Sequence, residues 1–321
     1  MIEPMYRQHA ATVKALAYRM TGSNADAEEI TQETFARALS SPPRSGLTRN
    51  WLLAVAANLS RDRLRRRKRA AYAGPWLPAA IEAGTTPEAV DPEQRYGMIE
   101  SASFAFLLAL EPLTSKQRAV LLLRDVFELS VEETAEALAM KPGAVRVLHL
   151  RARRATERYD ETRAIPSPER AAAVRVALER LGAAVAGGDR LQIESVLAEQ
   201  ASLYADGAGR FGALREVLTG ASALAKFFAF GQQRFSAFRR SSAIWPDVNG
   251  APALVIDNDP PEGSNVAPRA VLTCDVDSAG RITRLYVIAA PEKLSALPAS
   301  PATAVVPMPE LARPATTQPL S

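Results

Sequence analysis

The residues of this sequence best suited to chemistry are cationic, and they gather in two stretches of the chain. In the first stretch, RDRLRRRKR, seven of nine residues are Arg or Lys. So many like charges on adjacent helical turns repel one another, and a polyanion would relieve that repulsion by counterion release. We therefore predict a nucleic-acid contact rather than an acidic membrane surface, which would need a large apolar face beside the charges. The residues concerned are Arg61, Arg63, Arg65, Arg66, Arg67, Lys68 and Arg69.

The second stretch, LSVEETAEALAMKPGAVRVLHLRARRA, begins at Leu129 and combines two helical patterns. Ser130 and Glu133 can form a capping box, in which each side chain accepts a hydrogen bond from a free backbone N–H at the helix start. Met140-Lys141-Pro142 ends that helix and opens the next, because proline suits the first helical turn. Two helices around a tight turn predict a helix-turn-helix. Its outer face would bind DNA through Lys141, Arg146, His149, Arg153 and Arg154.

Acidic residues line a third segment, DAEEITQETFARAL, which follows GSN. Ser23 or Asn24 can cap this helix. Asp26, Glu29 and Glu33 lie on one side of it, facing solvent or a partner. The inward stripe would consist of Ala27, Ile30, Thr34 and Ala38.

The sequence offers few residues for a disulfide, a metal site or a membrane segment. A single cysteine, Cys274, allows no internal disulfide and is typical of a reducing cytoplasm. Two histidines beside it leave little for a zinc site. Carboxylate-only metal binding stays open but has no support in the sequence, and we predict neither a metal nor a cofactor. No apolar run reaches the roughly 20 residues that span a bilayer, and the N-terminus lacks the apolar core of a signal peptide. We therefore expect a cytoplasmic protein with no membrane partner.

The elements that must position these residues change in type along the 321-residue chain. Up to residue 162 the pattern predicts helices near 4–21, 24–40, 49–71, 95–110, 114–125, 130–139 and 142–160. A stretch rich in Pro and Gly, at residues 73–92, separates two helical modules. Further helices are expected near 168–186, 189–198 and 220–237.

Strand-like runs follow these last helices, at 253–256, 269–276 and 281–289. The turn DSAG joins the last two as a hairpin. Helices followed by an antiparallel sheet predict an α+β domain. From Pro298 onward the chain is rich in Pro, Ala and Thr, which predicts a disordered tail.

The three charged segments together resemble an extracytoplasmic-function sigma factor of bacterial RNA polymerase, over residues 5–71 and 98–158. DAEEITQETFARA resembles the family's helix that binds the polymerase clamp, and WLLAVAANLSRDRLRRRKR the helix that engages the minus-ten promoter element. The segment that starts LEPLTSKQRAV is similar to the region that reads the minus-thirty-five element. The implied partners are core RNA polymerase and promoter DNA. The polymerase-binding residues would be Asp26, Glu29, Gln32 and Glu33.

One departure from the family concerns the start of the recognition helix. Family members often have Ser or Asn there, whereas this chain has Lys141-Pro142. Arginine pairs with guanine O6 and N7 or holds phosphate, and the sequence does not assign these roles among the arginines.

The rest of the chain resembles the sigma-factor subgroup with a fused SnoaL-like domain, a cone-shaped α+β unit. The similar segments are YAGPWLP, GDRLQIESVLAEQASLYADGAGR, VNGAPALVI and APEKLSAL. The subgroup usually has WLPEP, DGGG and NPDKL where this chain has WLPAA, DGAG and APEKL. The resemblance implies that the extension regulates the sigma modules by folding back on them. Its interdomain residues would be Trp76, Leu77, Pro78, Asp206, Gly207, Gly209, Lys293 and Leu294.

Several of these residues have alternative interpretations. Trp76 and Leu77 would either meet the extension or cap the core of the first module. Gly207 and Gly209 allow a tight loop with positive φ beside Asp206, which is a turn residue, a docking contact or a pocket carboxylate.

Two other functions compete with promoter recognition. SnoaL-like folds also serve as cyclases and isomerases that use a carboxylate, but the predicted strands offer only Asp257, Asp259 and Asp275, with no histidine. We therefore expect no enzyme and no catalytic residues, with small-molecule sensing as the weaker alternative. A ligand-responsive helix-turn-helix regulator would leave the acidic helix and the basic helix unexplained.

The expected architecture is multidomain, with two all-α sigma modules followed by an α+β SnoaL-like cone-shaped domain. We expect sigma region 2 at 1–72, a linker at 73–97, sigma region 4 at 98–162, a regulatory domain at 166–297 and the tail at 298–321. The expected function is that of an alternative sigma factor that directs RNA polymerase to specific promoters under control of its own C-terminal domain.

Overall fold

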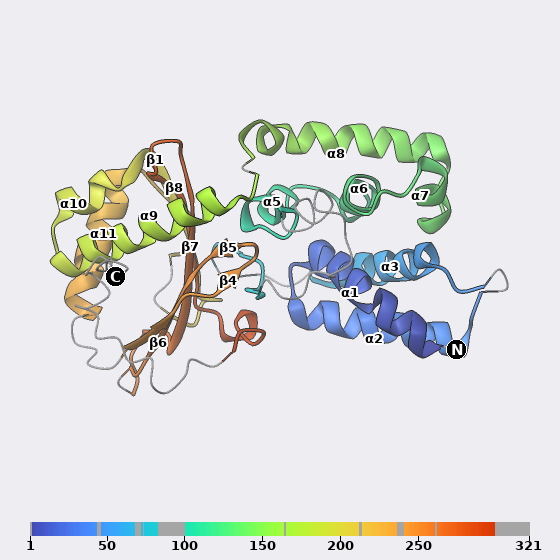
Figure 1. Cartoon of the computed structure of the whole chain (residues 1–321), viewed down its shortest axis with the longest axis horizontal. Coiled ribbons are helices and arrows are strands. Elements are labelled where there is room, and N and C mark those ends of the chain that lie inside the picture. Colours follow the sequence, from blue (N-terminus) through green and yellow to red (C-terminus); the bar gives the residue numbers. More distant parts are fainter. Residues whose placement is uncertain are drawn as a thin grey trace, which may run out of the picture. The chain divides into compact units, whose positions relative to one another are not determined.

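The computed structural model describes residues 2–43, 46–67, 72, 74–82, 100–163, 165–211, 214–235, 241–260 and 262–298. It divides into two compact units (Figure 1). The first contains Met1–Ala71 and Ile81–Pro166, and the second contains Tyr72–Ala80 and Ser167–Ser321. The short segment Tyr72–Ala80 therefore belongs to the second unit, although both of its neighbours along the chain belong to the first.

The first unit begins with three helices that pack against one another: α1 (Ile2–Thr21), α2 (Asn24–Ser40) and α3 (Arg49–Arg67). Ser23 caps α2, because its hydroxyl accepts a hydrogen bond from the Asp26 N–H at 3.2 Å. The inward stripe predicted for α2 is confirmed, since Ala27, Ile30, Thr34 and Ala38 are all buried.

The second half of this unit contains α5 (Phe104–Ala109), α6 (Ser115–Leu121), the π-helical turn η2 (Leu122–Val126), α7 (Val131–Ala137) and α8 (Pro142–Thr162). Thr114 and Gln117 form a capping box at the start of α6. The helix predicted at 114–125 exists, but its last turn widens into η2. Phe127 is the C-cap of η2 and precedes the positive-φ residue Glu128.

Buried arginines hold the two halves of the first unit together. Arg118 of α6 donates to the Met20 carbonyl at the end of α1 and to the Leu110 carbonyl, both at 2.8 Å. Arg19 of α1 donates to the Ser101 hydroxyl at 2.8 Å, and burial lowers the pKa of Arg19 to about 10. Charges buried this fully are tolerated only where hydrogen bonds replace their hydration.

The second unit combines helices with a sheet. Its helices are α9 (Pro168–Gly187), α10 (Arg190–Ser195), α11 (Ala221–Phe235) and the 3₁₀ turn η3 (Pro291–Lys293). Its strands are β1 (Leu197–Asp206), β2 (Leu218–Thr219), β3 (Ser241–Ile244), β4 (Asp247–Val248), β5 (Ala251–Pro252), β6 (Leu254–Asn258), β7 (Arg269–Val276) and β8 (Ile282–Ile288). The described strands form a sheet in the order β2-β1-β8-β7-β6-β3 and a separate β4-β5 ribbon.

Two features of this sheet differ from the sequence-based expectation. Strand β1 lies where we predicted the end of a helix and a loop. We did not expect a strand there because Ala and Glu, which are poor strand formers, occur in this segment. It also runs parallel to β8, so the sheet is mixed rather than antiparallel. The DSAG hairpin is confirmed: the Asp277 N–H donates to the Arg281 carbonyl at 2.9 Å, and β7 pairs antiparallel with β8.

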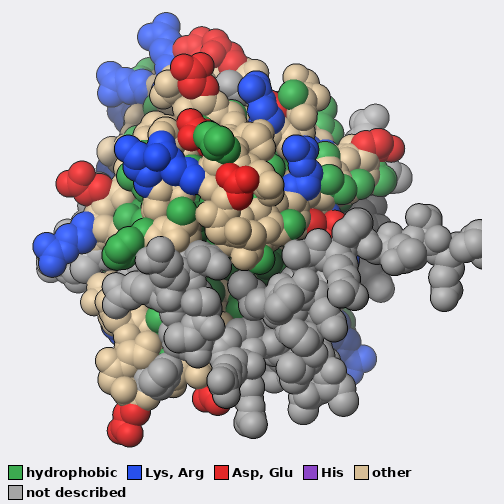
Figure 2. Space-filling model, turned by 90° about the vertical axis from the view of Figure 1, so that its left-hand side faces the viewer, with side chains coloured by type: hydrophobic (Ala, Val, Ile, Leu, Met, Phe, Trp, Pro, Cys, Tyr) green, Lys and Arg blue, Asp and Glu red, His purple; other side chains and the backbone are tan. Residues whose placement is uncertain are grey.

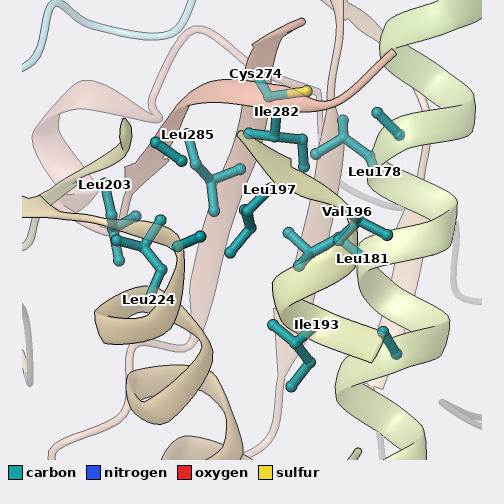
Figure 3. Close-up of a cluster of buried hydrophobic side chains, with 14 of the residues drawn as sticks. Leu178, Leu181, Ile193, Val196, Leu197, Leu203, Leu224, Cys274, Ile282 and Leu285 are labelled. Carbon is teal, nitrogen blue, oxygen red and sulfur yellow. The ribbon is translucent and has the colours of Figure 1, made fainter. Parts of the chain in front are cut away.

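A hydrophobic core fills the space between one face of the sheet and the helices α9, α10 and α11 (Figures 1 and 3). Alternate residues of β1 and β8, such as Leu203 and Leu285, point into this core, and Leu178, Ile193 and Leu224 meet them from the helices. The residues between them, such as Tyr204 and Tyr286, point to the opposite face, as the two-residue period of a strand requires. The last residue of β1, Asp206, lies on that opposite face.

Among the described residues, no helix is long and apolar enough to cross a membrane.

Candidate functional sites

The helix-turn-helix forms as its sequence predicts. The Ser130 hydroxyl accepts from the Glu133 N–H at 3.1 Å, and the Glu133 carboxylate accepts from the Ser130 N–H at 2.7 Å, which confirms the capping box. Pro142 is the first residue of α8 and Lys141 its N-cap. The turn comes slightly earlier than expected, because α7 ends at Ala137 and Ala139 adopts a left-handed φ of 51°.

Helix α8 buries one stripe and exposes the opposite side. Val145 and Ala152 are fully buried and Thr156 almost so. These three residues share the buried side because positions 145, 152 and 156 lie close to one line along an α-helix.

Three of the predicted DNA-binding side chains of α8 have acidic neighbours within the protein. The contacts are Arg146–Glu132 at 3.4 Å, His149–Asp125 at 2.7 Å, and Arg153 with Asp125 and Asp160, each at 3.6 Å. Such partly exposed pairs contribute little to stability, so they can be exchanged for contacts with a partner at little cost. Lys141 and Arg154 are exposed.

Three further residues lie on the outward side of α8 that we did not predict from the sequence. Val147 and Leu150 are 49 % and 53 % exposed, and Arg151 is exposed beside them. Their spacing could have revealed them, because residues 147, 150 and 151 lie opposite the stripe of Val145 and Ala152.

The structure describes the side chains of four predicted DNA-binding residues at the basic end of α3. Arg65 and Arg66 are exposed, and Arg61 and Arg63 are half-buried. Burial lowers the pKa of Arg61, and the positive charge of Arg65 lowers it further. The second effect is the repulsion expected between neighbouring cations in so dense a cluster. Lys68 and Arg69 lie outside the described residues, as does the side chain of Arg67.

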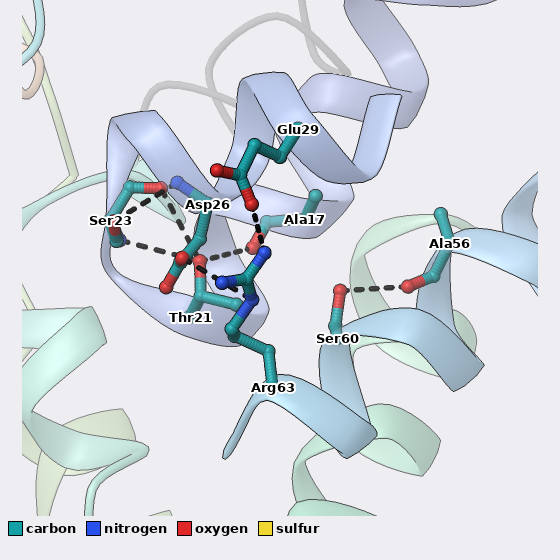
Figure 4. A network of polar contacts seen from close by, with 8 residues as sticks. All are labelled: Ala17, Thr21, Ser23, Asp26, Glu29, Ala56, Ser60 and Arg63. Atoms are coloured by element: carbon teal, nitrogen blue, oxygen red, sulfur yellow. Dashed lines mark hydrogen bonds and ion pairs between the residues drawn. The ribbon is translucent and has the colours of Figure 1, made fainter. Parts of the chain in front are cut away.

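Arg63 joins the predicted DNA-binding set to the predicted polymerase-binding set. Its guanidinium lies 3.4 Å from the Asp26 carboxylate and also pairs with Glu29, and both acids belong to α2 (Figure 4). Asp26 is half-buried and paired within the protein, whereas we expected the whole stripe to face solvent or a partner. The rest of that stripe is exposed: Gln32 is open, and Glu33 pairs with Arg37 one turn further on at 2.8 Å.

The predicted interdomain residues converge on the Asp206 carboxylate within the second unit. Asp206 is 1 % exposed and accepts hydrogen bonds from the Leu77 N–H at 2.7 Å and the Tyr72 hydroxyl at 2.6 Å. Lys293 Nζ lies 2.6 Å from the same carboxylate and donates to the Leu77 carbonyl at 2.7 Å. Backbone bonds extend the contact, because the Ala80 N–H donates to the Lys293 carbonyl at 2.8 Å.

Aromatic rings complete this site, which we call the linker clasp and define as Tyr72, Trp76, Leu77, Asp206 and Lys293. Lys293 Nζ lies 4.5 Å from the centre of the Tyr72 ring and 4.8 Å from that of Trp76, in cation–π geometry. Leu77 is fully buried. Of the three interpretations of Asp206, the observed contacts therefore favour the docking contact.

Two further parts of the clasp region are the residues Pro78 and Leu294 and the DGAG loop. Pro78 and Leu294 are buried beside the clasp. In the DGAG loop the left-handed residues are Ala208, with φ of 51°, and Gly209, with φ of 72°, so the positive φ expected for Gly207 was wrong. The loop turns one residue later, where the Ala208 N–H donates to the Asp206 carboxylate at 3.1 Å.

The carboxylates considered for catalysis are engaged elsewhere or open to solvent. Asp257 lies 3.2 Å from Arg269, and Asp275 accepts from the Tyr286 hydroxyl at 2.7 Å. Asp259 is exposed. Among the described residues, no cluster of three or more His, Cys, Asp or Glu could hold a metal ion.

Figure 2 looks at the side of the molecule on which α10 and α11 lie in Figure 1. Lys and Arg alternate there with Asp and Glu and with apolar side chains. A DNA-binding surface needs a field of one sign, which the described side chains on this face do not provide.

Comparisons with known proteins identify the family of the chain. The Sigma-70 region 2 family matches residues 5–70, and the Sigma-70 region 4 family matches residues 103–155. The ECF RNA polymerase sigma factor SigJ of Mycobacterium tuberculosis is 31 % identical over 294 residues, which cover 91 % of this chain and 92 % of SigJ. The sigma factor SigG of the same species is 38 % identical over 43 % of each chain.

A crystal structure of Mycobacterium tuberculosis SigJ has the same fold over nearly the whole length. The TM-score is 0.67 at 28 % sequence identity, and the match covers 90 % of this chain and 96 % of that one. The similarity includes the C-terminal unit as well as the two helical regions. This chain therefore belongs to the extracytoplasmic-function sigma factors of RNA polymerase.

Proposed function

We propose that this sigma factor is controlled by its own C-terminal domain through the linker clasp. In this proposal region 2 (1–72) binds core RNA polymerase through α2 and the minus-ten element through the basic end of α3. Region 4 (98–162) reads the minus-thirty-five element with α8. Residues 73–97 form the linker, 166–297 the SnoaL-like regulatory domain and 298–321 a tail. The chain would act by binding rather than catalysis, in the cytoplasm with RNA polymerase.

The observation that carries the proposal is the position of the clasped segment in the chain. Tyr72–Ala80 lies between region 2 and region 4, yet it packs with Ser167–Ser321. An extended chain spans at most about 3.5 Å per residue, so holding about nine residues removes about 30 Å from the reach of the linker. Closing or opening the clasp would therefore change how far the two DNA-binding modules can separate.

Sensing of a small molecule or catalysis by the SnoaL-like domain receives less support. Asp206 is satisfied by Leu77, Tyr72 and Lys293, and Asp257 and Asp275 have partners of their own. A general acid or base needs a carboxyl that faces a substrate site.

Transcription in vitro with core polymerase tests the proposal. Trp76→Ala and Asp206→Ala should change the yield of the full-length protein in the same direction, because both open the clasp. In a chain that ends at residue 164, Trp76→Ala should have no effect, because the regulatory domain is absent. An equal effect of Trp76→Ala in both chains would contradict the proposal and return Trp76 to a role in the core of the first module.

Truncation before Ala290 shows whether the closed clasp lowers or raises transcription. This deletion removes Lys293, so it should reproduce Asp206→Ala. A rise in transcription identifies the closed clasp as a restraint, and a fall identifies it as a means of orienting the modules.

A further inference from the structure

Helix α8 carries two exposed aliphatic side chains where a DNA-reading helix usually has polar ones. Val147 and Leu150 are 49 % and 53 % exposed. Neither has a role in the core, which α8 meets through Val145 and Ala152. At about 100° per residue, positions 147 and 150 fall on the side of the helix opposite those two. They therefore occupy the middle of the surface that α8 offers to a partner.

The charged residues around this pair indicate the chemistry of the partner. Arg151 and Arg154 flank the pair and are exposed, and within the described part of the chain neither side chain forms an ion pair or hydrogen bond. Arg146 lies on the other side and leans toward Glu132 of α7 at 3.4 Å. Two aliphatic groups inside a ring of arginines are too small an apolar area for a protein interface, whereas the arginines complement a polyanion.

One apolar group is available to such a pair in the major groove of DNA, the C5 methyl group of thymine. Valine and leucine have no polar atoms with which to read any other base edge. We propose that Val147 and Leu150 recognise thymine methyl groups in the minus-thirty-five element, while Arg151 and Arg154 hold the phosphates beside them. This inference rests on the proposed role of α8 in promoter binding.

The test removes the methyl group from DNA and the aliphatic group from the protein in turn. A duplex library with a randomised minus-thirty-five element is selected with the full-length chain and core polymerase. Each thymine of the selected element is then replaced by deoxyuridine, which lacks the methyl group. Binding should weaken about fourfold at the contacted thymine, the value of one buried methyl group. Val147→Ala or Leu150→Ala should weaken binding to the thymine duplex and abolish the response to deoxyuridine at that position.

Val176→Ala is the matched control, because Val176 is 51 % exposed on α9 in the other unit. It should leave both affinity and the response to deoxyuridine unchanged. The inference is overturned if deoxyuridine has no effect on the wild type, or if its effect persists in both α8 variants. Weaker binding of either variant to core polymerase without DNA would likewise overturn it in favour of a protein contact. Failure of the wild type to select any sequence would instead contradict the proposed promoter-binding role of α8.

Discussion

Lys293 Nζ lies 2.6 Å from Asp206 Oδ2, and the two side chains are 10 % and 0 % exposed. The residues are 87 positions apart in the chain and meet where β1 and η3 come together. Both also bond the backbone of Leu77, one through its N–H and the other through its carbonyl. The ion pair and the clasped linker therefore form one polar network, in which loss of any member leaves a buried group without its partner.

Removing the cation from this network should open the clasp. Lys293→Met leaves the Asp206 carboxylate buried and unpaired, which typically costs about 3–5 kcal/mol. We expect a loss of that order in the free energy of unfolding of the second unit, with faster hydrogen exchange at residues 74–80. Urea denaturation and exchange mass spectrometry measure the two effects.

Arg210→Met is the matched control for that experiment. It removes the ion pair of Arg210 with Glu292, which is 3.5 Å long and exposed on both sides, so it should cost less than about 1 kcal/mol. Similar losses in the two variants would contradict a special role for Lys293.

The approach of the linker to the second unit predicts a steric effect at Gly74. A Cβ atom at this position would lie 3.0 Å from the Leu214 carbonyl oxygen, and its φ is 87°. Gly74→Ala should therefore displace the linker and increase the exposure of Trp76, detected as a red shift of tryptophan fluorescence. Gly46 has nearly the same φ, 88°, with open space around it. Gly46→Ala should add only backbone strain of about 1–2 kcal/mol, so an equal red shift in both variants would speak against a clash.

Different arginines of α8 should contact bases and phosphates. We expect Arg146→Ala to cost roughly 1–3 kcal/mol and to relax the preference at one base pair, because Arg146 lies nearest the start of the helix. Arg153→Ala or Arg154→Ala should weaken all sequences about equally and reduce the salt dependence of binding by about one ion. Binding titrations over a set of promoter variants at several salt concentrations distinguish the two. Identical sequence profiles for all three variants would show the assignment to be wrong.

Charge reversal on α2 should weaken the association with core polymerase. Glu29→Lys with Glu33→Lys removes two exposed acids, and we expect at least tenfold weaker binding with unchanged helix content. Glu179→Lys is the matched control, because Glu179 pairs with Arg175 one turn away on α9 just as Glu33 pairs with Arg37 on α2. Retained polymerase affinity in the double variant would exclude this face of α2 as the contact.

The capping box of α7 predicts a pH dependence. The Ser130 backbone N–H, together with its hydroxyl, lowers the pKa of Glu133 below its ordinary value of 4.5. Because the folded-state pKa is the lower one, this stabilisation is complete above about pH 4.5 and is lost as the pH falls through the folded-state pKa. Glu133→Gln keeps the capping geometry without titrating. The difference in unfolding free energy between wild type and Glu133→Gln should shrink from pH 6 to pH 3, and a constant difference would contradict this.

The parts of this protein that depend on local chemistry were predictable from sequence. Ser130 and Glu133 cap α7, Ser23 caps α2 and Pro142 opens α8, because each of these bonds joins residues within one helical turn. The buried stripe of α2 follows from helical periodicity alone. The DSAG hairpin likewise depends on a few adjacent residues. The motifs for the two sigma regions also lie within single helices or adjacent pairs.

What the tertiary structure decided involves residues far apart in the chain. Strand β1 was missed because its residues prefer a helix, and only pairing with β8 and burial against α9, α10 and α11 make it a strand. No local pattern predicts that Arg63 would neutralise Asp26 and Glu29, or that Arg118 would cap α1. The sequence motifs proposed Asp206, Trp76 and Lys293 as interdomain residues, but their roles as acceptor, ring and cation emerge only where β1, the linker and η3 meet. Such contacts depend on the free energy of the whole fold, because the entropy of closing long loops must be offset before any one of them forms.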